Sequence, residues 1–428
     1  KLHNDANQTQ TAPGEIQNSK HNVQHLFQKQ LFHIPLTLGL LSADGDTLPL
    51  KLTGSTAEKN QDSIILELRK QSETFVFEDV SVAPIPSLLR GFSAPVKLHF
   101  DYSNAELAFL LANDTDEFNR WEAGQQLMIR ISLEQIQRFQ NNEPFNLSSE
   151  LENAFRSLLK QTAEGDPALL ALALSFPNEP YLGELMDVID VEAIHETRKF
   201  LRTELAQKLQ PEFENTYLNF QKEGQFKIDQ QSMGRRSLKN VCLGYLTELE
   251  SLEFRKLAQT QFHKNENMTD VAGALGVLTH LDCTERETAF SAFENRWRKN
   301  TVVMDKWFAL QAISSLPKTL DNVQNLTSHP AFEKNNPNKI RALISTFSRF
   351  NQLRFHAGDG SGYEFIAEQV LRLDPLNPQI AARLVSVFNN WKKFTETHKT
   401  KMNYQLQKIV KTPKLSGDVF EIVSKALG

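Results

Sequence analysis

The sequence of 428 residues is poor in cysteine, with only Cys242 and Cys283. Two cysteines far apart in the chain fit neither a disulfide framework nor a thiolate metal site, so we expect both to be reduced residues in or near the core. No apolar run is long enough to span a membrane, and the sequence therefore predicts no membrane partner. The net charge of −5 argues against a general nucleic-acid surface.

A common zinc-binding pattern is also missing. His-Glu-x-x-His places two histidines on one face of a helix, where they bind zinc, with the first glutamate as general base. The one His-Glu pair of the chain is His195–Glu196, and the position of the second histidine holds Lys199, whose charge would repel a metal cation. We therefore predict that the chain holds no metal, no cofactor and no catalytic residue.

The first part of the chain has the pattern of β-structure. Residues 1–28 are rich in Asn, Gln and His, and we interpret them as a linker or disordered tail. Residues 29–104 predict a small antiparallel β-sandwich, which we expect to be truncated at its start, because short segments of alternating apolar and polar residues are separated by Gly and Pro. The alternation covers residues 34–40, 48–52, 64–68, 75–77 and 96–100.

Residues 105–428 predict a helical domain. Apolar residues such as Phe118, Trp121 and Met128 recur at helical spacing, and most prolines fall at helix starts or in turns. No strict repeat of roughly 33–45 residues is visible, which excludes a regular ankyrin or TPR array. The fold class is therefore mostly α, with a small antiparallel β-sandwich followed by an irregular, α-solenoid-like superhelix of stacked helix pairs.

Two motifs of the helical region have simple structural explanations. The stripe from Met304 to Gln311 recurs on one helical face, and we expect it to face the core. The run QFHKNENMTD at 261–270 has too few acidic residues for calcium and one histidine, which binds transition metals weakly. We expect Asn267 or Thr269 to cap the helix that follows.

The segment 355–383 begins with a glycine-rich loop. Glycines at positions 358, 360 and 362 let this loop lie tight against another surface. The loop lacks the lysine of a phosphate-binding loop and no strand precedes it, so we interpret it as a structural turn. The polar groups of His356, Asp359 and Tyr363, together with the helix after the loop, make this segment the strongest candidate for a functional site.

That helix has a clear start. Asn377 is a good N-cap, and Pro378 suits the first helical position. Gln379 and Arg383 follow one turn apart and share a face of the helix. From this spacing alone, an arginine on a helix surface is usually a solvated side chain.

Several runs, in order, resemble the C-terminal half of bacterial aminopeptidase N, a family of gluzincin-type zinc metallo-aminopeptidases. The resemblance covers roughly residue 30 to the C-terminus, while the family's catalytic motif and its Gly-Ala-Met-Glu-Asn strand are absent. It implies a non-catalytic β-sandwich and helical region of an enzyme that removes N-terminal residues from short peptides. The runs are FVFEDV at 75–80, FSAPVKL at 92–98, QFHKNENMTD at 261–270, VVMDKWFALQA at 302–312, NPNKIRALI at 336–344, FHAGDGSGYEFIAEQVLRLDPLNPQIAAR at 355–383 and LSGDVFEIVSKAL at 415–427.

The resemblance also implies a role for two residues. In the family, a Gln and an Arg at these positions of the matching run project towards the active-site cavity and border the part of the peptide beyond the cleaved bond. Gln379 and Arg383 are therefore candidate substrate-binding residues, and the planar, permanently charged fork of arginine suits a peptide carboxylate. The helical region would cap the active site and limit substrate access.

The implied partners are short peptides and the missing N-terminal and catalytic domains, which would supply the zinc of the parent enzyme. We expect the fragment alone to be inactive, and we expect a cytoplasmic location. The alternative is a stand-alone helical scaffold whose concave face binds another protein. An upstream His-Glu-x-x-His in the same gene would decide between the two.

Overall fold

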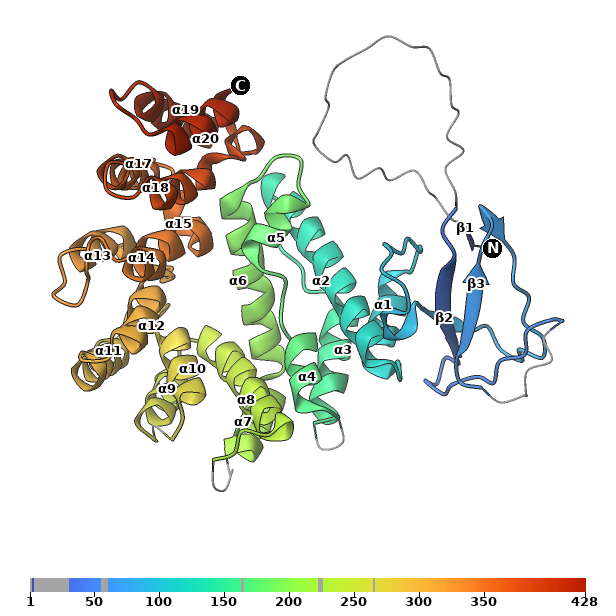
Figure 1. The fold of residues 1–428 in the computed structure, drawn as a ribbon. Helices are drawn as coiled ribbons and strands as arrows, with labels where there is room; N and C mark the ends of the chain where they lie inside the picture. The colour runs from blue at the N-terminus through green and yellow to red at the C-terminus, as the bar shows by residue number, and fades with distance from the viewer. Residues whose placement is uncertain (1, 4–30, 55–60, 163–164, 222–225, 265) are drawn as a thin grey trace, which may run out of the picture. The chain divides into compact units, whose positions relative to one another are not determined.

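The computed structural model describes residues 2–3, 31–54, 61–162, 165–221, 226–264 and 266–428 (Figure 1). The chain divides into two compact units, 1–127 and 128–428. The predicted tail at 1–28 lies outside the described residues, except for Leu2 and His3, which form a short strand.

The described residues of the first unit form two small antiparallel sheets. The central strand of the larger sheet pairs with one neighbour on each side, in the order β3-β2-β5, and the smaller sheet pairs β1 with β4. Alternate residues of the central strand, Leu36, Leu38 and Leu40, are buried and form the core of this sheet. The elements are β1 (Leu2–His3), β2 (Ile34–Leu41), β3 (Ile64–Leu68), β4 (Ser72–Glu73), β5 (Ile85–Leu88), the 3₁₀ turn η1 (Arg90–Phe92) and the helix α1 (Asn104–Asn113).

The structure corrects part of the predicted strand pattern. The strands predicted at 34–40 and 64–68 are confirmed as β2 and β3. The segments 48–52 and 75–77 form only isolated bridges, and the strand predicted at 96–100 is wrong, because no β-partner pairs with it among the described residues. Alternating polarity is not sufficient for a strand when no neighbouring backbone satisfies the hydrogen bonds.

The sequence pattern did not reveal β5, because prolines such as Pro84 and Pro86 are expected to separate strands rather than to lie within one. β5 is an edge strand of the sheet, where a proline does not interrupt a ladder on both sides. Pro86 lies opposite Leu40, and the hydroxyl of Tyr102 donates to the carbonyl oxygen of Pro86 at 2.6 Å. Pro86 is therefore compatible with the edge strand, and its carbonyl oxygen has a hydrogen-bond partner.

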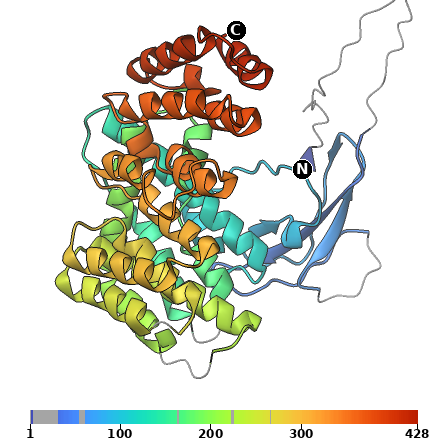
Figure 2. The same ribbon diagram turned by 60° about the vertical axis from the view of Figure 1, so that its left-hand side comes forward.

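The rest of the described chain is helical (Figures 1 and 2). It confirms the predicted fold class, a small antiparallel β-region followed by stacked helices. The remaining helices are α2 (Glu117–Gln140), α3 (Ser149–Lys160), α4 (Pro167–Ala173), α5 (Glu179–Glu184), α6 (Val191–Lys208), α7 (Gln210–Gln221), α8 (Gln230–Glu248), α9 (Leu252–Lys264), α10 (Met268–Leu278), α11 (Thr284–Trp297), α12 (Thr301–Ala312), α13 (Thr319–Leu326), α14 (Pro337–Ile340), the π-helical turn η2 (Arg341–Ser345), α15 (Thr346–Phe350), α16 (Gln352–Phe355), α17 (Ser361–Leu373), α18 (Pro378–Val385), η3 (Ser386–Phe388), η4 (Trp391–Lys393), α19 (Glu396–Val410) and α20 (Gly417–Leu427).

Side-chain caps define many of the helix starts. Asp190, Asn267 and Asn300 each accept a hydrogen bond from a backbone N–H of the first turn, as N-cap residues do. The prediction that Asn267 caps a helix is thus confirmed. Helices that follow one another then pack as pairs, for example α7 with α8, α9 with α10, and α17 with α18.

The predicted core stripe is also confirmed. Met304, Trp307, Phe308 and Gln311 of α12 are all buried. Cys242 is buried and Cys283 is half-buried, and neither forms a disulfide. Among the described residues, no helix combines the length and the apolar character that a bilayer crossing requires.

The second unit brings distant segments together. The backbone N–H of Ile189, just before α6, donates to the carbonyl oxygen of Lys393 at 2.7 Å, and Ile189 forms a parallel bridge with Phe394. Segments that lie far apart in the sequence are therefore joined by backbone pairing within this unit.

Candidate functional site

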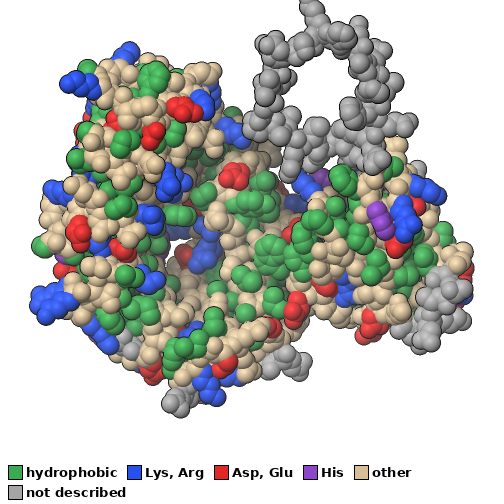
Figure 3. Space-filling model, viewed as in Figure 1, with side chains coloured by type: hydrophobic (Ala, Val, Ile, Leu, Met, Phe, Trp, Pro, Cys, Tyr) green, Lys and Arg blue, Asp and Glu red, His purple; other side chains and the backbone are tan. Residues whose placement is uncertain are grey.

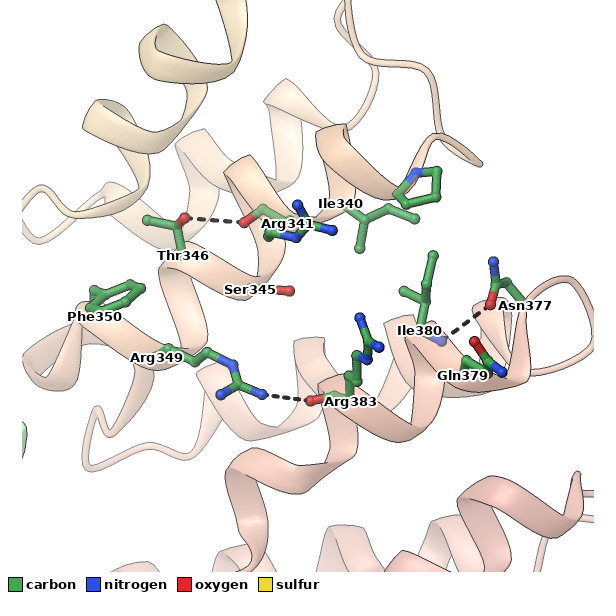
Figure 4. Close-up of a pocket in the computed structure, with 11 residues that line it drawn as sticks. Ile340, Arg341, Ser345, Thr346, Arg349, Phe350, Asn377, Gln379, Ile380 and Arg383 are labelled. Atoms are coloured by element: carbon green, nitrogen blue, oxygen red, sulfur yellow. Dashed lines mark hydrogen bonds between the residues drawn. The ribbon is translucent and has the colours of Figure 1, made fainter. Parts of the chain in front are cut away.

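The helix α18 forms one wall of a pocket and carries both predicted site residues. The side chain of Asn377 accepts a hydrogen bond from the backbone N–H of Ile380 at 3.2 Å, and Pro378 occupies the first turn. The predicted helix start is thus confirmed. Gln379 and Arg383 are exposed on the same helix and line the pocket together (Figure 4).

The opposite wall is a continuous helical segment built from α14, η2 and α15. It begins at Asn336 and Pro337, so an Asn-Pro pair starts this wall as it starts α18. The side chain of Asn336 accepts from the backbone N–H of Asn338 at 3.0 Å. The π-helical turn at Arg341–Ser345 lies directly at the pocket, and such turns are often found at functional sites.

The π-turn aligns two arginines. In an uninterrupted α-helix, residues eight positions apart point roughly 80° away from each other. A π-turn takes up one extra residue, which reduces this angle to roughly 20°. Arg341 and Arg349 therefore lie on one face, and both line the pocket.

The pocket between the two walls has a volume of about 430 Å³, at the lower end of the range for small-ligand sites. Figure 4 shows Ile340 and Ile380 extending towards each other from opposite walls, with Arg383 rising between the helices. None of the eleven described residues that line the pocket is acidic. The lining residues are Pro337, Ile340, Arg341, Ser345, Thr346, Arg349, Phe350, Asn377, Gln379, Ile380 and Arg383.

The three arginines differ in how their side chains are held. Arg349 donates through Nη2 to the carbonyl oxygen of Arg383 at 2.9 Å and to the hydroxyl of Ser386 at 3.1 Å. Arg341 donates to the amide oxygen of Asn338 at 3.3 Å. Within the described part of the chain, neither of these arginines nor Arg383 forms an ion pair. The pocket therefore presents positive charge that is not paired with an acidic side chain of the described residues.

Three polar residues near the glycine-rich loop do not belong to this pocket. His356 and Tyr363 are buried, and Nδ1 of His356 lies 2.8 Å from the tyrosine hydroxyl. The same hydroxyl lies 3.0 Å from Nδ1 of His398, so its single proton goes to one histidine while the other donates to it. Asp359 accepts from the backbone N–H of Ser361 at 2.9 Å. These residues hold the loop and its surroundings together.

The loop itself is a structural turn, as predicted. Gly360 has φ +81°, a conformation that favours glycine. A Cβ at Gly362 would lie 2.3 Å from the carbonyl oxygen of Phe355, so this position requires glycine for the close approach. No ligand is needed to explain either glycine.

The histidine of the His-Glu pair has a different partner. Nδ1 of His195 lies 2.8 Å from Oε1 of Glu179, and Arg198 lies 3.7 Å from the same oxygen. Burial would raise the pKa of Glu179, but the hydrogen bond from His195 and the charge of Arg198 outweigh it and lower this pKa. In the described residues, no group of three or more His, Cys, Asp or Glu side chains could hold a metal ion.

The surface charge is mixed. Figure 3 shows basic and acidic side chains scattered among each other over this face of the helical unit. On the face seen there, the described residues do not form the broad basic stripe of a nucleic-acid surface.

The sequence patterns indicated one wall of the pocket and not the other. Arg341 and Arg349 were not singled out, because their approach to α18 depends on packing between distant segments. The available signal was the Asn-Pro pair at Asn336–Pro337, which repeats the pair before Gln379.

Comparisons with known proteins match nearly the whole chain. The family described as "Domain of unknown function (DUF3458_C) ARM repeats" matches residues 104–428, and "Domain of unknown function (DUF3458) Ig-like fold" matches residues 6–101. Aminopeptidase N of Escherichia coli (strain K12) is 36% identical over 401 residues, which cover 94% of this chain and 45% of that protein. Aminopeptidase N of Caulobacter vibrioides is 37% identical over 393 residues, which cover 91% of this chain and 44% of that protein.

A solved structure is similar as well. The crystal structure of Legionella pneumophila aminopeptidase A in complex with aspartic acid matches with a TM-score of 0.77 and 29% identity, covering 92% of this chain and 45% of that chain. These matches confirm the resemblance to the C-terminal part of aminopeptidase N. The chain spans less than half the length of the curated relatives that it matches.

Proposed function

Because this chain belongs to the DUF3458_C family of ARM-repeat domains and is homologous to the C-terminal part of aminopeptidase N, we propose that it is the non-catalytic C-terminal region of a zinc-dependent aminopeptidase. The parent enzyme removes N-terminal residues from short peptides. Within it, residues 29–104 form the β-sandwich domain and residues 105–428 form the helical domain. The location is cytoplasmic.

Zinc is held by other parts of the parent enzyme in this proposal. The described residues do not offer a ligand set for the metal, and the sequence has no His-Glu-x-x-His. Zinc, when bound by the missing catalytic domain, supplies an activated water. The partners of this chain are that domain, the N-terminal domain and short peptides.

The helical region caps the active-site cavity and limits access to small, unstructured peptides. In this role, its pocket meets the end of the peptide that is not cleaved. The observation that carries the proposal is the position of Gln379 and Arg383 in one 430 Å³ pocket whose lining contains no acidic residue. A guanidinium without an ion-pair partner is available to a carboxylate, and the amide of Gln379 adds a neutral hydrogen-bonding group.

The experiment replaces Arg383 by alanine in the full-length parent enzyme. A charge-assisted hydrogen bond that is partly solvated contributes about 1–2 kcal/mol, so KM for short peptides with a free carboxylate should rise about 5- to 30-fold. The contact is made to a part of the peptide that does not react, so kcat should change less.

Two controls make the result specific. Peptides amidated at the C-terminus and aminoacyl-anilides lack the carboxylate, and their kinetics should be nearly unchanged in the variant. Arg298→Ala removes an exposed arginine outside the pocket and should leave all substrates unaffected. Equal losses for peptides and anilides in Arg383→Ala would contradict the proposed contact.

A further inference from the structure

The pocket holds more positive charge than one carboxylate requires. A single carboxylate is satisfied by one guanidinium, which binds it through two parallel hydrogen bonds. Three arginines line this cavity without an ion-pair partner among the described residues, although the chain as a whole has a net charge of −5. A second anionic group on the ligand would account for the excess.

Arg349 and Arg341 have different roles in the pocket. Nη2 of Arg349 already donates hydrogen bonds at the end of α18, to the carbonyl oxygen of Arg383 and to the hydroxyl of Ser386. Its bonds hold the helix that carries Arg383. Arg341 stands on the other wall, and its bond to Asn338 at 3.3 Å uses only Nη1. Arg341 therefore has donors left for a ligand that also reaches Arg383.

The remaining lining groups fit a short amino-acid side chain between the two charges. Ile340 and Ile380 approach from opposite walls and offer an apolar contact for methylene groups (Figure 4). Ser345 and Thr346 add hydroxyl groups on the wall of Arg341. Thr346 already donates to the carbonyl oxygen of Arg341 at 3.1 Å. An extended apolar side chain would offer no partner to the donors of Arg341 that its bond to Asn338 leaves unused.

We propose that this pocket prefers peptides whose C-terminal residue is Asp or Glu. The α-carboxylate binds Arg383 and the side-chain carboxylate binds Arg341, while the methylene groups lie between Ile340 and Ile380. This inference rests on the proposed function, since it takes the peptide end as the occupant of the pocket. It adds the class of C-terminal residue.

The test measures binding of four peptides to the 428-residue chain by isothermal titration calorimetry. The peptides are Ala-Ala-Glu, Ala-Ala-Gln and the C-terminal amide of each. Glu and Gln have nearly the same shape, so their difference reports the side-chain charge. We expect Ala-Ala-Glu to bind on the order of tenfold more tightly than Ala-Ala-Gln, as one additional charge-assisted hydrogen bond provides.

Two variants separate the two contacts. Arg341→Gln should remove the difference between Ala-Ala-Glu and Ala-Ala-Gln, and Arg341→Lys should retain part of it. Arg383→Gln should weaken both free acids relative to their amides. Arg341 and Arg383 are exposed, so these substitutions should leave the circular dichroism spectrum and the melting temperature unchanged.

The outcomes distinguish this inference from the proposed function. If free acids bind better than amides but Glu and Gln peptides bind equally, the preference for acidic residues is wrong and the carboxylate contact stands. If amides bind as well as free acids, the carboxylate contact at Arg383 is wrong. Both the proposed peptide contact and the preference for acidic C-terminal residues are then contradicted. If inorganic phosphate binds as tightly as Ala-Ala-Glu, the pocket is a general anion site and the assignment to acidic peptide ends is overturned.

Discussion

Nη2 of Arg349 donates to the carbonyl oxygen of Arg383 at 2.9 Å, so an arginine of one pocket wall fastens the last turn of the other. The same nitrogen donates to the hydroxyl of Ser386, which itself donates to the carbonyl oxygen of Arg383 at 2.8 Å. A cation at a helix C-terminus also interacts favourably with the helix dipole. Arg349 thus positions the helix that presents Arg383.

Replacing Arg349 by methionine should loosen the end of α18. The lost hydrogen bonds are solvent-exposed, so the free energy of unfolding should fall by only about 1 kcal/mol. Hydrogen exchange should become faster at the backbone amides of residues 383–388, and Arg349→Lys should restore part of the protection. Unchanged exchange in this segment would show that Arg349 does not position α18.

The chain alone should contain no stoichiometric zinc and should not hydrolyse aminoacyl-anilides. The described residues do not provide a cluster of metal-ligating side chains, and His195 is engaged by Glu179. Elemental analysis after dialysis against a chelator and then against zinc is the measurement. One bound zinc per chain, accompanied by hydrolysis, would contradict the proposed division between this chain and a catalytic domain.

Lys339 should contribute strongly to stability. It is buried, and Nζ donates to Oδ1 of Asp305 and to the carbonyl oxygen of Thr301, both at 2.6 Å. Lys339→Met fills similar space but leaves both acceptors without this donor. Because Asp305 is partly solvated, we expect a loss of about 2–3 kcal/mol in urea unfolding rather than the larger loss of a fully buried pair.

The matched control for Lys339 is Lys425→Met. Lys425 pairs with Glu421 at 2.6 Å, but both side chains are mostly exposed. An exposed pair one helical turn apart contributes about 0.3–0.5 kcal/mol, so this variant should unfold almost as the parent does. Equal losses in the two variants would mean that burial is not what makes Lys339 important.

Gly362→Ala should destabilise the close approach of the first turn of α17 to the backbone of Phe355. The new Cβ would lie 2.3 Å from the carbonyl oxygen of Phe355, a backbone atom that cannot move aside easily. We expect a loss of about 2–3 kcal/mol in the free energy of unfolding. Gly358→Ala is the control, because no atom lies within 4 Å of a Cβ there and φ is not positive, so its effect should be within about 0.5 kcal/mol.

Local sequence signals predicted local features well. Asn377 and Pro378 marked the start of α18, because an N-cap bonds within its own first turn. Asn267 or Thr269 was expected to cap α10, and Asn267 does so. The helical spacing from Met304 to Gln311 indicated the buried face of α12, and this spacing is also a local pattern. These features depend on residues close together in the chain.

Features that depend on distant segments were not predicted. Pro86 is compatible with a strand only because β5 lies at an edge of the sheet, and the position of a strand in a sheet is not a local property. Arg341 and Arg349 share a face only because of the π-turn between them. They line one pocket with Arg383 only because their helical segment, distant in the sequence, lies opposite α18. Local sequence patterns therefore did not reveal the pocket wall that α14, η2 and α15 form.

The buried pair formed by His356 and Tyr363 predicts a pH dependence of stability. Burial, together with a smaller effect of the nearby His398, lowers the pKa of His356 to about 3. In the unfolded chain this pKa returns to about 6.5. Between these two values the unfolded chain binds a proton that the folded chain does not, so stability decreases as pH falls below about 6.5.

His356→Gln should reduce this pH dependence. For the parent chain, the His356 contribution to the free energy of unfolding should decrease by about 2 kcal/mol from pH 7 to pH 5. The variant lacks the titrating group, so its own loss over this range should be smaller by that amount, even though it starts less stable without the histidine. His398, whose pKa is also lowered mainly by burial, remains and contributes equally to both. Urea unfolding at the two pH values measures the difference, and parallel losses in parent and variant would show that His356 is protonated in the folded chain or does not titrate on unfolding.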